Sequence, residues 1–196
     1  MSYVGIIITY VFVSNFVLTQ FLGLCPFIGV SRRVESAVGL GFAVTFVMSL
    51  ASITTWAVHR LLLLPLGIGF LQTVTFVLVI AALVQLVELV VQKVSPPLYK
   101  ALGIYLPLFT TNCAILGIAL IAVREDYGPL ESFVAGIAAG VGFMLALLLM
   151  STLREKLQSE WVPKYFRGAP IAFVTAGLMA LAFMAFDNAL LNNLVG

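Results

Sequence analysis

The spacing of its charged residues is the feature that most constrains this chain. The six longest stretches without any Asp, Glu, Lys or Arg cover residues 1–31, 36–58, 61–87, 101–123, 132–153 and 168–186. A helix that crosses a bilayer needs about 20 apolar residues, whereas a transmembrane β-barrel would show alternating segments of about 10 residues. The sequence therefore predicts an all-α integral membrane protein. Its six transmembrane helices are expected near residues 3–23, 37–58, 68–91, 98–122, 131–152 and 169–188.

Composition excludes several other classes of protein. Hydrophobic residues make up 62% of the chain, charged residues make up 9%, and the net charge is +2. A soluble domain has about 25% charged residues, and a nucleic-acid-binding module needs a dense basic face. The first charge-free stretch lacks the basic segment and the clear cleavage site of a signal peptide. We therefore expect a protein embedded in a lipid bilayer. Its first charge-free stretch is expected to remain as a transmembrane segment rather than to be cleaved.

The basic residues predict the orientation in the membrane. Loops 1, 3 and 5 of a six-span chain hold Arg32, Arg33, Lys93, Lys100, Arg154, Lys156, Lys164 and Arg167, whereas the other side holds only Arg60 and Arg124. Cytoplasmic loops carry the excess of Lys and Arg. Loops 1, 3 and 5 are therefore predicted to be cytoplasmic, and both termini are predicted to lie outside.

The two halves of the chain share a cysteine pattern. Cys25 begins a Cys-x-x-x-Gly pattern that ends at Gly29, and Cys113 begins the same pattern, which ends at Gly117. The two cysteines are the only ones in the sequence.

Two further pairs of matches follow in the same order. Glu35-Ser36 recurs as Glu131-Ser132, and Glu88 and Asp187 fall near the ends of the third and sixth spans. These matches predict two repeats of three spans, residues 1–97 and 98–196, within one membrane domain. An odd number of spans per repeat gives the repeats opposite orientations, and the working site of such proteins tends to lie on broken helices at the repeat interface.

The first cysteine is predicted to lie at a break in helix 1. A half-helix that begins at Pro26 after a break at Gly23 explains the local sequence, because proline is favoured at the start of a helix. Asn15 and Gln20 could mark an earlier break.

The second cysteine is predicted to lie at a break in helix 4. Thr110-Thr111-Asn112 supplies three capping-type residues directly before Cys113. The N-terminus of a helix carries about half a positive charge, which favours the thiolate form of a nearby cysteine. Two such helix ends would form a site for an anionic group held by two sulfurs.

Simpler interpretations of the cysteines compete with this one. A membrane cysteine is usually a small core residue, and a disulfide is a further alternative. The shared pattern and the shared break favour a metal site. Two thiolates do not complete an iron–sulfur or a zinc site, and His59, next to Arg60, is more typical of an interfacial residue than of a ligand. The two missing ligands are therefore expected from another polypeptide.

Other polar residues carry weaker predictions. Glu88 in span 3 is a candidate for a functional carboxylate, but it can also extend to the cytoplasmic interface. Asp187 is in a similar position at the outer face. Gly136-x-x-x-Gly140 is predicted to be a motif for close helix packing.

Two motifs resemble those of a known family. Residues 21–27 (Phe-Leu-Gly-Leu-Cys-Pro-Phe) resemble the first cysteine motif of the A subunits of Rnf electron-transport complexes, and residues 106–114 (Leu-Pro-Leu-Phe-Thr-Thr-Asn-Cys-Ala) resemble the second. Similarity extends over the whole chain, including residues 95–99, 166–168 and 175–179. The E subunits of the sodium-pumping NADH–quinone reductase share this plan, but Pro26 and Thr111 look more like the Rnf members.

The resemblance implies a function. Rnf complexes couple electron transfer between NADH and ferredoxin to the movement of Na⁺ or H⁺ across the bacterial inner membrane. The A-like and E-like subunits pair, and each gives two cysteines to one [2Fe–2S] cluster, so Cys25 and Cys113 would be the ligands here. Subunits B, C, D, E and G would be the partners, and flavins and further clusters would lie on those partners. The chain would then be a translocase subunit that is not catalytic alone. The rival interpretation is an inverted-repeat secondary transporter, or a membrane scaffold, without a cluster.

Overall fold

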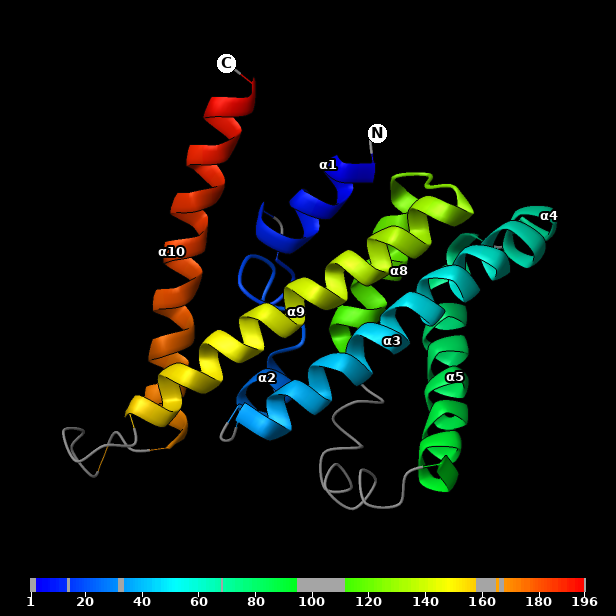
Figure 1. The fold of residues 1–196 in the computed structure, drawn as a ribbon. Helices are drawn as coiled ribbons and strands as arrows, with labels where there is room; N and C mark the ends of the chain where they lie inside the picture. Colours follow the sequence, from blue (N-terminus) through cyan, green and yellow to red (C-terminus); the bar gives the residue numbers. More distant parts are fainter. Residues whose placement is uncertain are drawn as a thin grey trace.

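The computed structural model describes residues 3–13, 15–31, 34–67, 69–94, 112–157, 165 and 168–195, and every regular element in these ranges is helical (Figure 1). In chain order the elements are α1 (Tyr3–Ile8), the π-helical η1 (Thr9–Val13), α2 (Leu24–Val30), α3 (Val34–Val58), the π-helical η2 (His59–Leu63), α4 (Leu64–Leu66), the 3-10 helix η3 (Gly69–Leu71), α5 (Gln72–Val94), α8 (Cys113–Arg124), α9 (Pro129–Leu157) and α10 (Ala169–Val195). The predicted all-α fold class is confirmed for this part of the chain.

Three of the described helices are long and apolar enough to cross a membrane. They cover Val34–Leu63, Gln72–Val90 and Pro129–Leu157, and they coincide with the predicted spans 2, 3 and 5. Two shorter apolar helices, Cys113–Arg124 and Ala169–Ala185, fall in the predicted spans 4 and 6. Residues 98–111, the first part of predicted span 4, lie outside the described residues.

The first predicted span is not one continuous helix, as the predicted break implies, but the break begins earlier than Gly23. α1 ends at Ile8, η1 ends at Val13, and residues 15–23 contain turns but no helix. Asn15 is fully buried; its Nδ2 donates to the carbonyl of Gly142 (2.7 Å), and its own carbonyl accepts from the backbone N–H of Thr19 (2.9 Å). The side chain of Asn15 thus forms a hydrogen bond with a distant backbone carbonyl at the break, so the chain can leave the helical path inside an apolar protein. The break is thus the earlier one that Asn15 and Gln20 indicate.

The second span is longer than predicted, because the helix does not stop at the charged residue near its end. α3 continues through η2 and α4, and the helical path ends only at Gly67, whose φ is 66°. Arg60 lies on this extension and forms an exposed ion pair with Asp126 (3.5 Å). An exposed charge therefore does not mark the end of this helix.

Helices α3 and α9 pack with their backbones in close contact. A Cβ atom built on Gly140 would lie 2.6 Å from Cα of Thr45, and one built on Gly136 would lie 2.9 Å from the carbonyl oxygen of Met48. No side chain larger than hydrogen fits at either place, so the two glycines allow this approach. The predicted close-packing role of Gly136-x-x-x-Gly140 is confirmed.

The two packed helices run in opposite directions (Figure 1). Near the start of α9, Ser52 Oγ donates to the carbonyl of Ser132 (2.6 Å). Further along α9, a Cβ atom on Gly41 would lie 2.6 Å from Cγ of Met144. Residue numbers fall along α3 as they rise along α9, so the pair is antiparallel.

The buried core lies between this pair and the short helices around the cysteines. Its largest fully buried side chains include Phe16, Phe27, Phe143, Met48, Ile115 and Ile118. These residues come from the turns before α2, from α2 itself and from α3, α8 and α9. The two helices that carry the cysteines, α2 and α8, therefore pack against the buried core.

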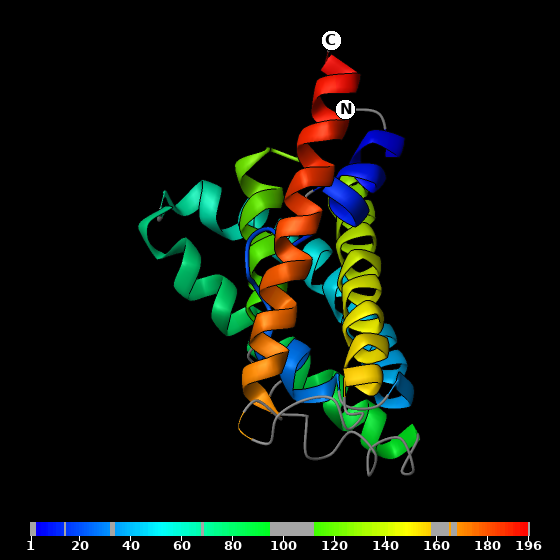
Figure 2. The ribbon, with the colours of Figure 1, turned by 90° about the vertical axis from the view of Figure 1, so that its left-hand side faces the viewer.

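The start of α1 and the C-terminal end of α10 lie at one end of the molecule, and the views in Figures 1 and 2 agree on this. The start of α3 and the C-terminal ends of α5 and α9 lie at the opposite end. Of the basic residues assigned to cytoplasmic loops, Arg32, Arg33, Lys100, Lys164 and Arg167 lie outside the described residues. Which end faces the cytoplasm stays a prediction.

Candidate functional site

Cys25 is the second residue of α2. The preceding Gly23 caps the helix with left-handed backbone angles (φ 81°, ψ 23°) and no side-chain hydrogen bond. Pro26 follows in the first turn, where a helix needs no backbone N–H from it. The half-helix therefore begins at Leu24, two residues before the start that Pro26 predicted, because proline is tolerated throughout the first turn.

Cys113 is the first residue of α8. Asn112 caps this helix, since its side-chain Oδ1 accepts from the backbone N–H of Ala114 (3.1 Å). This arrangement confirms the predicted helix start at the second cysteine, and Asn112 performs the capping that its position indicated. Thr110 and Thr111, the other two predicted capping residues, lie outside the described residues.

The beginnings of the two cysteine helices lie against each other. A Cβ atom built on Gly23 would lie 2.9 Å from Oδ1 of Asn112 and 3.2 Å from Cβ of Ala114. Gly23 is thus required for two reasons, its positive φ and this close approach. Residues 88 positions apart in the sequence, Cys25 and Cys113, therefore both sit within two residues of one contact between helix ends.

Asn112 also contains an orphaned donor at this contact. Its side chain is only 4% exposed, and its Nδ2 has no hydrogen-bond partner in the described part of the chain. A buried amide N–H without a partner is unfavourable by about 1–3 kcal/mol. Such groups in native proteins often indicate a missing ligand or a functional role.

Both cysteine side chains are exposed, and no disulfide joins them. They are therefore not the buried packing residues of the simplest interpretation. Among the described residues, no group of three or more His, Cys, Asp or Glu side chains could hold a metal ion.

The other predicted site residues lie away from these helices in the sequence and on other elements. His59 lies in η2, where its ring meets the ring of Phe76 edge-on, with centroids 6.4 Å apart. Glu88 is half-buried on α5, and Asp187 lies in α10. A functional role of Glu88 or Asp187 stays a prediction.

Arg154 is a residue whose role the sequence did not indicate. Although it is charged, it is 6% exposed, and its Nη1 donates to the carbonyl of Ile28 (2.7 Å) and to Oγ of Ser31 (2.8 Å). Basic side chains commonly bind the last carbonyls of a helix, and here the helix is the one that carries Cys25. Its neighbours Glu155 and Lys156 are exposed, so the sequence alone gives no signal that Arg154 turns inward.

Comparison with known proteins identifies the family. The family model described as "Rnf-Nqr subunit, membrane protein" matches residues 3–190. The chain belongs to the Rnf-Nqr family. Its apolar helices and this membership together make it a multi-pass membrane protein.

Relatives of the Rnf-Nqr chain cover nearly its full length. It is 55% identical over 188 residues to the A subunit of the Na⁺-translocating ferredoxin:NAD⁺ oxidoreductase complex of Acetobacterium woodii, covering 96% of this chain and 98% of the relative. It is 54% identical over 187 residues to the A subunit of the ion-translocating oxidoreductase complex of Edwardsiella ictaluri, covering 95% of this chain and 97% of the relative. The predicted resemblance to the A subunits of Rnf complexes is confirmed.

Proposed function

We propose that this chain is the A-type membrane subunit of an ion-translocating ferredoxin:NAD⁺ oxidoreductase complex in the bacterial inner membrane. We further propose that it carries electrons through half of a [2Fe–2S] site whose ligands from this chain are Cys25 and Cys113. The names of the two relatives support the first statement. The contact between the two cysteine helices supports the second.

The residues at this contact fit such a group. Cysteine thiolates are the ligands that iron–sulfur clusters select, and both thiols are exposed where a partner can reach them. Gly23 keeps the two helix ends close, because any Cβ there would meet Asn112. The orphaned Nδ2 of Asn112, next in sequence to Cys113, is a donor of the kind that tunes iron–sulfur centres.

Each part of the site has a separate task. A [2Fe–2S] cluster bound here would take up and release one electron at a time. The capped start of α8 orients Cys113, and the left-handed Gly23 orients Cys25. Arg154 holds the far end of α2, so that Cys25 keeps its position relative to the core.

The proposal requires a partner, because two thiolates are half of the usual four ligands. We assign the other two to the homologous E subunit of the complex. Subunits B, C, D and G complete the assembly and carry the flavins and the other clusters. The Rnf-Nqr chain is then a translocase subunit without catalytic activity of its own.

We also propose that residues 1–97 and 98–196 are inverted repeats with broken helices 1 and 4. The antiparallel packing of α3 against α9 supports this. Two side-chain bonds that link the halves near the ends of α3 and α9 also support it. Arg154 of the second half donates to Ile28 of the first, and Trp56 Nε1 of the first half donates to the carbonyl of Tyr127 in the second (2.8 Å). From the distribution of basic residues we propose that both termini are periplasmic and that loops 1, 3 and 5 are cytoplasmic. A periplasm-specific reporter fused to the C-terminus tests this orientation.

The decisive experiment measures iron, acid-labile sulfide and the EPR spectrum of this chain, purified alone and with the E subunit. We expect a [2Fe–2S] signal from the pair and none from the single chain. Stoichiometric iron in the single chain would contradict the shared site. A pair without iron that still forms would instead favour a transporter or a scaffold.

A further inference from the structure

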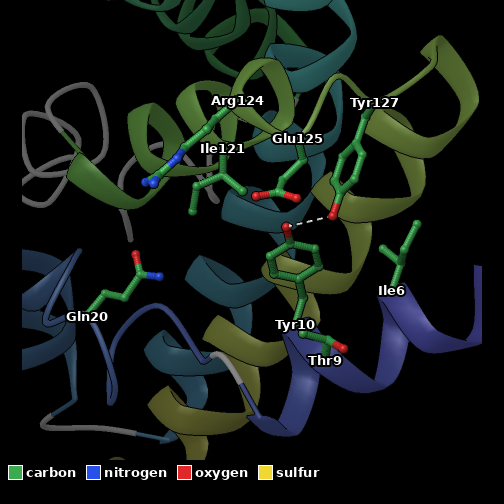
Figure 3. A pocket seen from close by; sticks show the side chains of 8 residues that line it. All are labelled: Ile6, Thr9, Tyr10, Gln20, Ile121, Arg124, Glu125 and Tyr127. Carbon is green, nitrogen blue, oxygen red and sulfur yellow. Dashed lines mark hydrogen bonds between the residues drawn. The ribbon is translucent and has the colours of Figure 1, made fainter. Parts of the chain in front are cut away.

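A cavity of about 340 Å³ opens at the end of α8 opposite to Cys113 (Figure 3). One wall comes from η1 and the turn that follows, with Thr9, Tyr10 and Gln20. The other wall comes from the end of α8 and the residues after it, with Arg124, Glu125 and Tyr127. Both walls of the cavity thus carry polar side chains, although 62% of the residues in the chain are hydrophobic.

Two buried hydroxyl groups lie at this cavity. Tyr10 and Tyr127 are 6% and 9% exposed, and their Oη atoms lie 3.2 Å apart. Two phenol groups carry two protons, and the hydrogen bond between them uses only one. The pair therefore still has a proton to donate and oxygen lone pairs to offer. The two hydroxyl groups can therefore form further hydrogen bonds to a bound group.

A carboxylate completes the group of oxygens. Figure 3 shows the carboxylate of Glu125 turned toward the two tyrosine hydroxyls, whereas the guanidinium of Arg124 points away from them, toward Gln20. Glu125 directly follows Arg124, the last residue of α8. The C-terminus of a helix carries about half a negative charge. The oxygen-rich side of the cavity is therefore the negative side.

Oxygen ligands of this kind select hard cations. Carboxylate and hydroxyl oxygens suit alkali and alkaline-earth ions rather than soft metals. One carboxylate with an arginine nearby supplies too little negative charge for tight binding of a divalent ion, whose affinity follows the number of charged ligands. The volume also leaves room for several water molecules around an ion. A hydrated monovalent cation fits these conditions best.

We propose that this cavity binds a hydrated Na⁺-class cation, with Glu125 as the charged ligand and the hydroxyls of Tyr10 and Tyr127 as neutral ligands. The proposal rests on the proposed function, which requires a cation to be moved. α8 has 12 residues, so the cavity and Cys113 lie roughly 18 Å apart along one helix at about 1.5 Å per residue. One helix thus connects the proposed redox site to the cation site.

The test is equilibrium binding of radioactive sodium to the purified whole complex. We expect Glu125→Gln to remove one bound Na⁺ per complex, and Tyr127→Phe to keep the number of ions but weaken binding about threefold, an effect of under 1 kcal/mol. Asp126→Asn is the matched control, because this neighbouring carboxylate pairs with Arg60 and, unlike the equally exposed Glu125, does not line the cavity. Its sodium binding is expected to equal that of the wild type.

Two results would overturn the proposal. One is unchanged sodium binding in Glu125→Gln. The other is a loss of sodium binding in Arg124→Gln without one in Glu125→Gln, since a cation site does not depend on a guanidinium. The [2Fe–2S] EPR signal of the same samples reports the proposed function separately. A complex that binds sodium through Glu125 but contains no cluster would refute the redox site and leave the cation site standing.

Discussion

The two cysteine helices reach the same arrangement by different means. α8 is 12 residues long, and its cap is the side chain of Asn112, the residue directly before Cys113. α2 is only seven residues long, has no side-chain cap at Gly23, and is held at its other end by Arg154 of α9. α8 is therefore stabilised by its own sequence, whereas α2 is stabilised by a residue more than 100 positions away.

Two cysteines in equivalent positions of the proposed repeats can therefore be held in place by different contacts. A helix as short as α2 is not stable by itself, because the first turn of a helix is unfavourable to form. Its position depends on tertiary contacts at both ends. We expect a substitution of Arg154, at the far end of α2, to disturb Cys25 alone, and substitutions of the two cysteines themselves to act equally.

The largest effect is expected from the ligands. Cys25→Ser and Cys113→Ser should each abolish electron transfer through the complex, and to the same extent, because serine is a poor replacement for a soft thiolate. The measurement is ferredoxin-dependent NAD⁺ reduction in membranes that contain equal amounts of assembled complex. A packing role would instead cost about 1 kcal/mol and leave turnover near normal. Near-normal turnover in either variant would exclude that cysteine as a ligand.

The next largest effect is expected from Gly23→Ala, which should be strongly destabilising. Its left-handed backbone costs an alanine about 1–2 kcal/mol, and the contact with Asn112 adds an overpacking cost, for a total of about 3 kcal/mol. Gly67→Ala is the matched control, because Gly67 has a similar φ of 66° but open space around it. We expect a clearly lower thermal aggregation temperature in detergent for Gly23→Ala than for Gly67→Ala. Equal temperatures would show that the close approach of the two helix ends is not tight.

Arg154→Met should loosen α2 but not α8. The substitution removes donors to Ile28 and Ser31, and a hydrogen bond to a charged group contributes about 1.5–3 kcal/mol. In the chain without a cluster, we expect faster alkylation of Cys25 and no change at Cys113, each followed by peptide mass spectrometry. Lys156→Met, an exposed change in the same last turn of α9, serves as the control. Equal acceleration at both cysteines would mean that Arg154 stabilises the whole molecule rather than α2.

The smallest effect is expected at the cap of α8. Asn112→Ala removes the bond to the backbone N–H of Ala114 and should cost about 1 kcal/mol, whereas Asn112→Ser keeps a capping oxygen and should cost less. Thermal unfolding of the purified chain in detergent measures both. If the two variants were equally unstable, the cap would not be the main contribution of Asn112.

The sequence predicted those parts of the fold that depend on local patterns. Charge-free stretches located the long helices α3, α5 and α9, and the run of capping residues located the start of α8. The break in the first span ends at Gly23 as predicted but begins earlier, near Asn15, which the sequence offered only as an alternative, because the apolar composition of residues 3–23 hides the turns that Asn15 stabilises through Gly142. That bond joins residues 127 positions apart, so no local pattern reveals it.

The same reasoning applies to the site. Each cysteine was found from its own motif, since proline, glycine and asparagine have strong positional preferences at helix ends. The contact between Gly23 and Asn112, the inward turn of Arg154 and the pair of Tyr10 and Tyr127 each depend on how distant segments pack. Arg154 in particular was assigned to a loop, because a charged residue after an apolar stretch usually ends it.

The close contact of α3 with α9 has a mechanical consequence. At Gly136 and Gly140 the backbone of one helix touches the other, so no layer of side chains there can rearrange to absorb a displacement. The two helices can shift only as one rigid unit, together with the core that carries both cysteines. A change of access across the membrane would therefore have to keep the two cysteines at constant spacing.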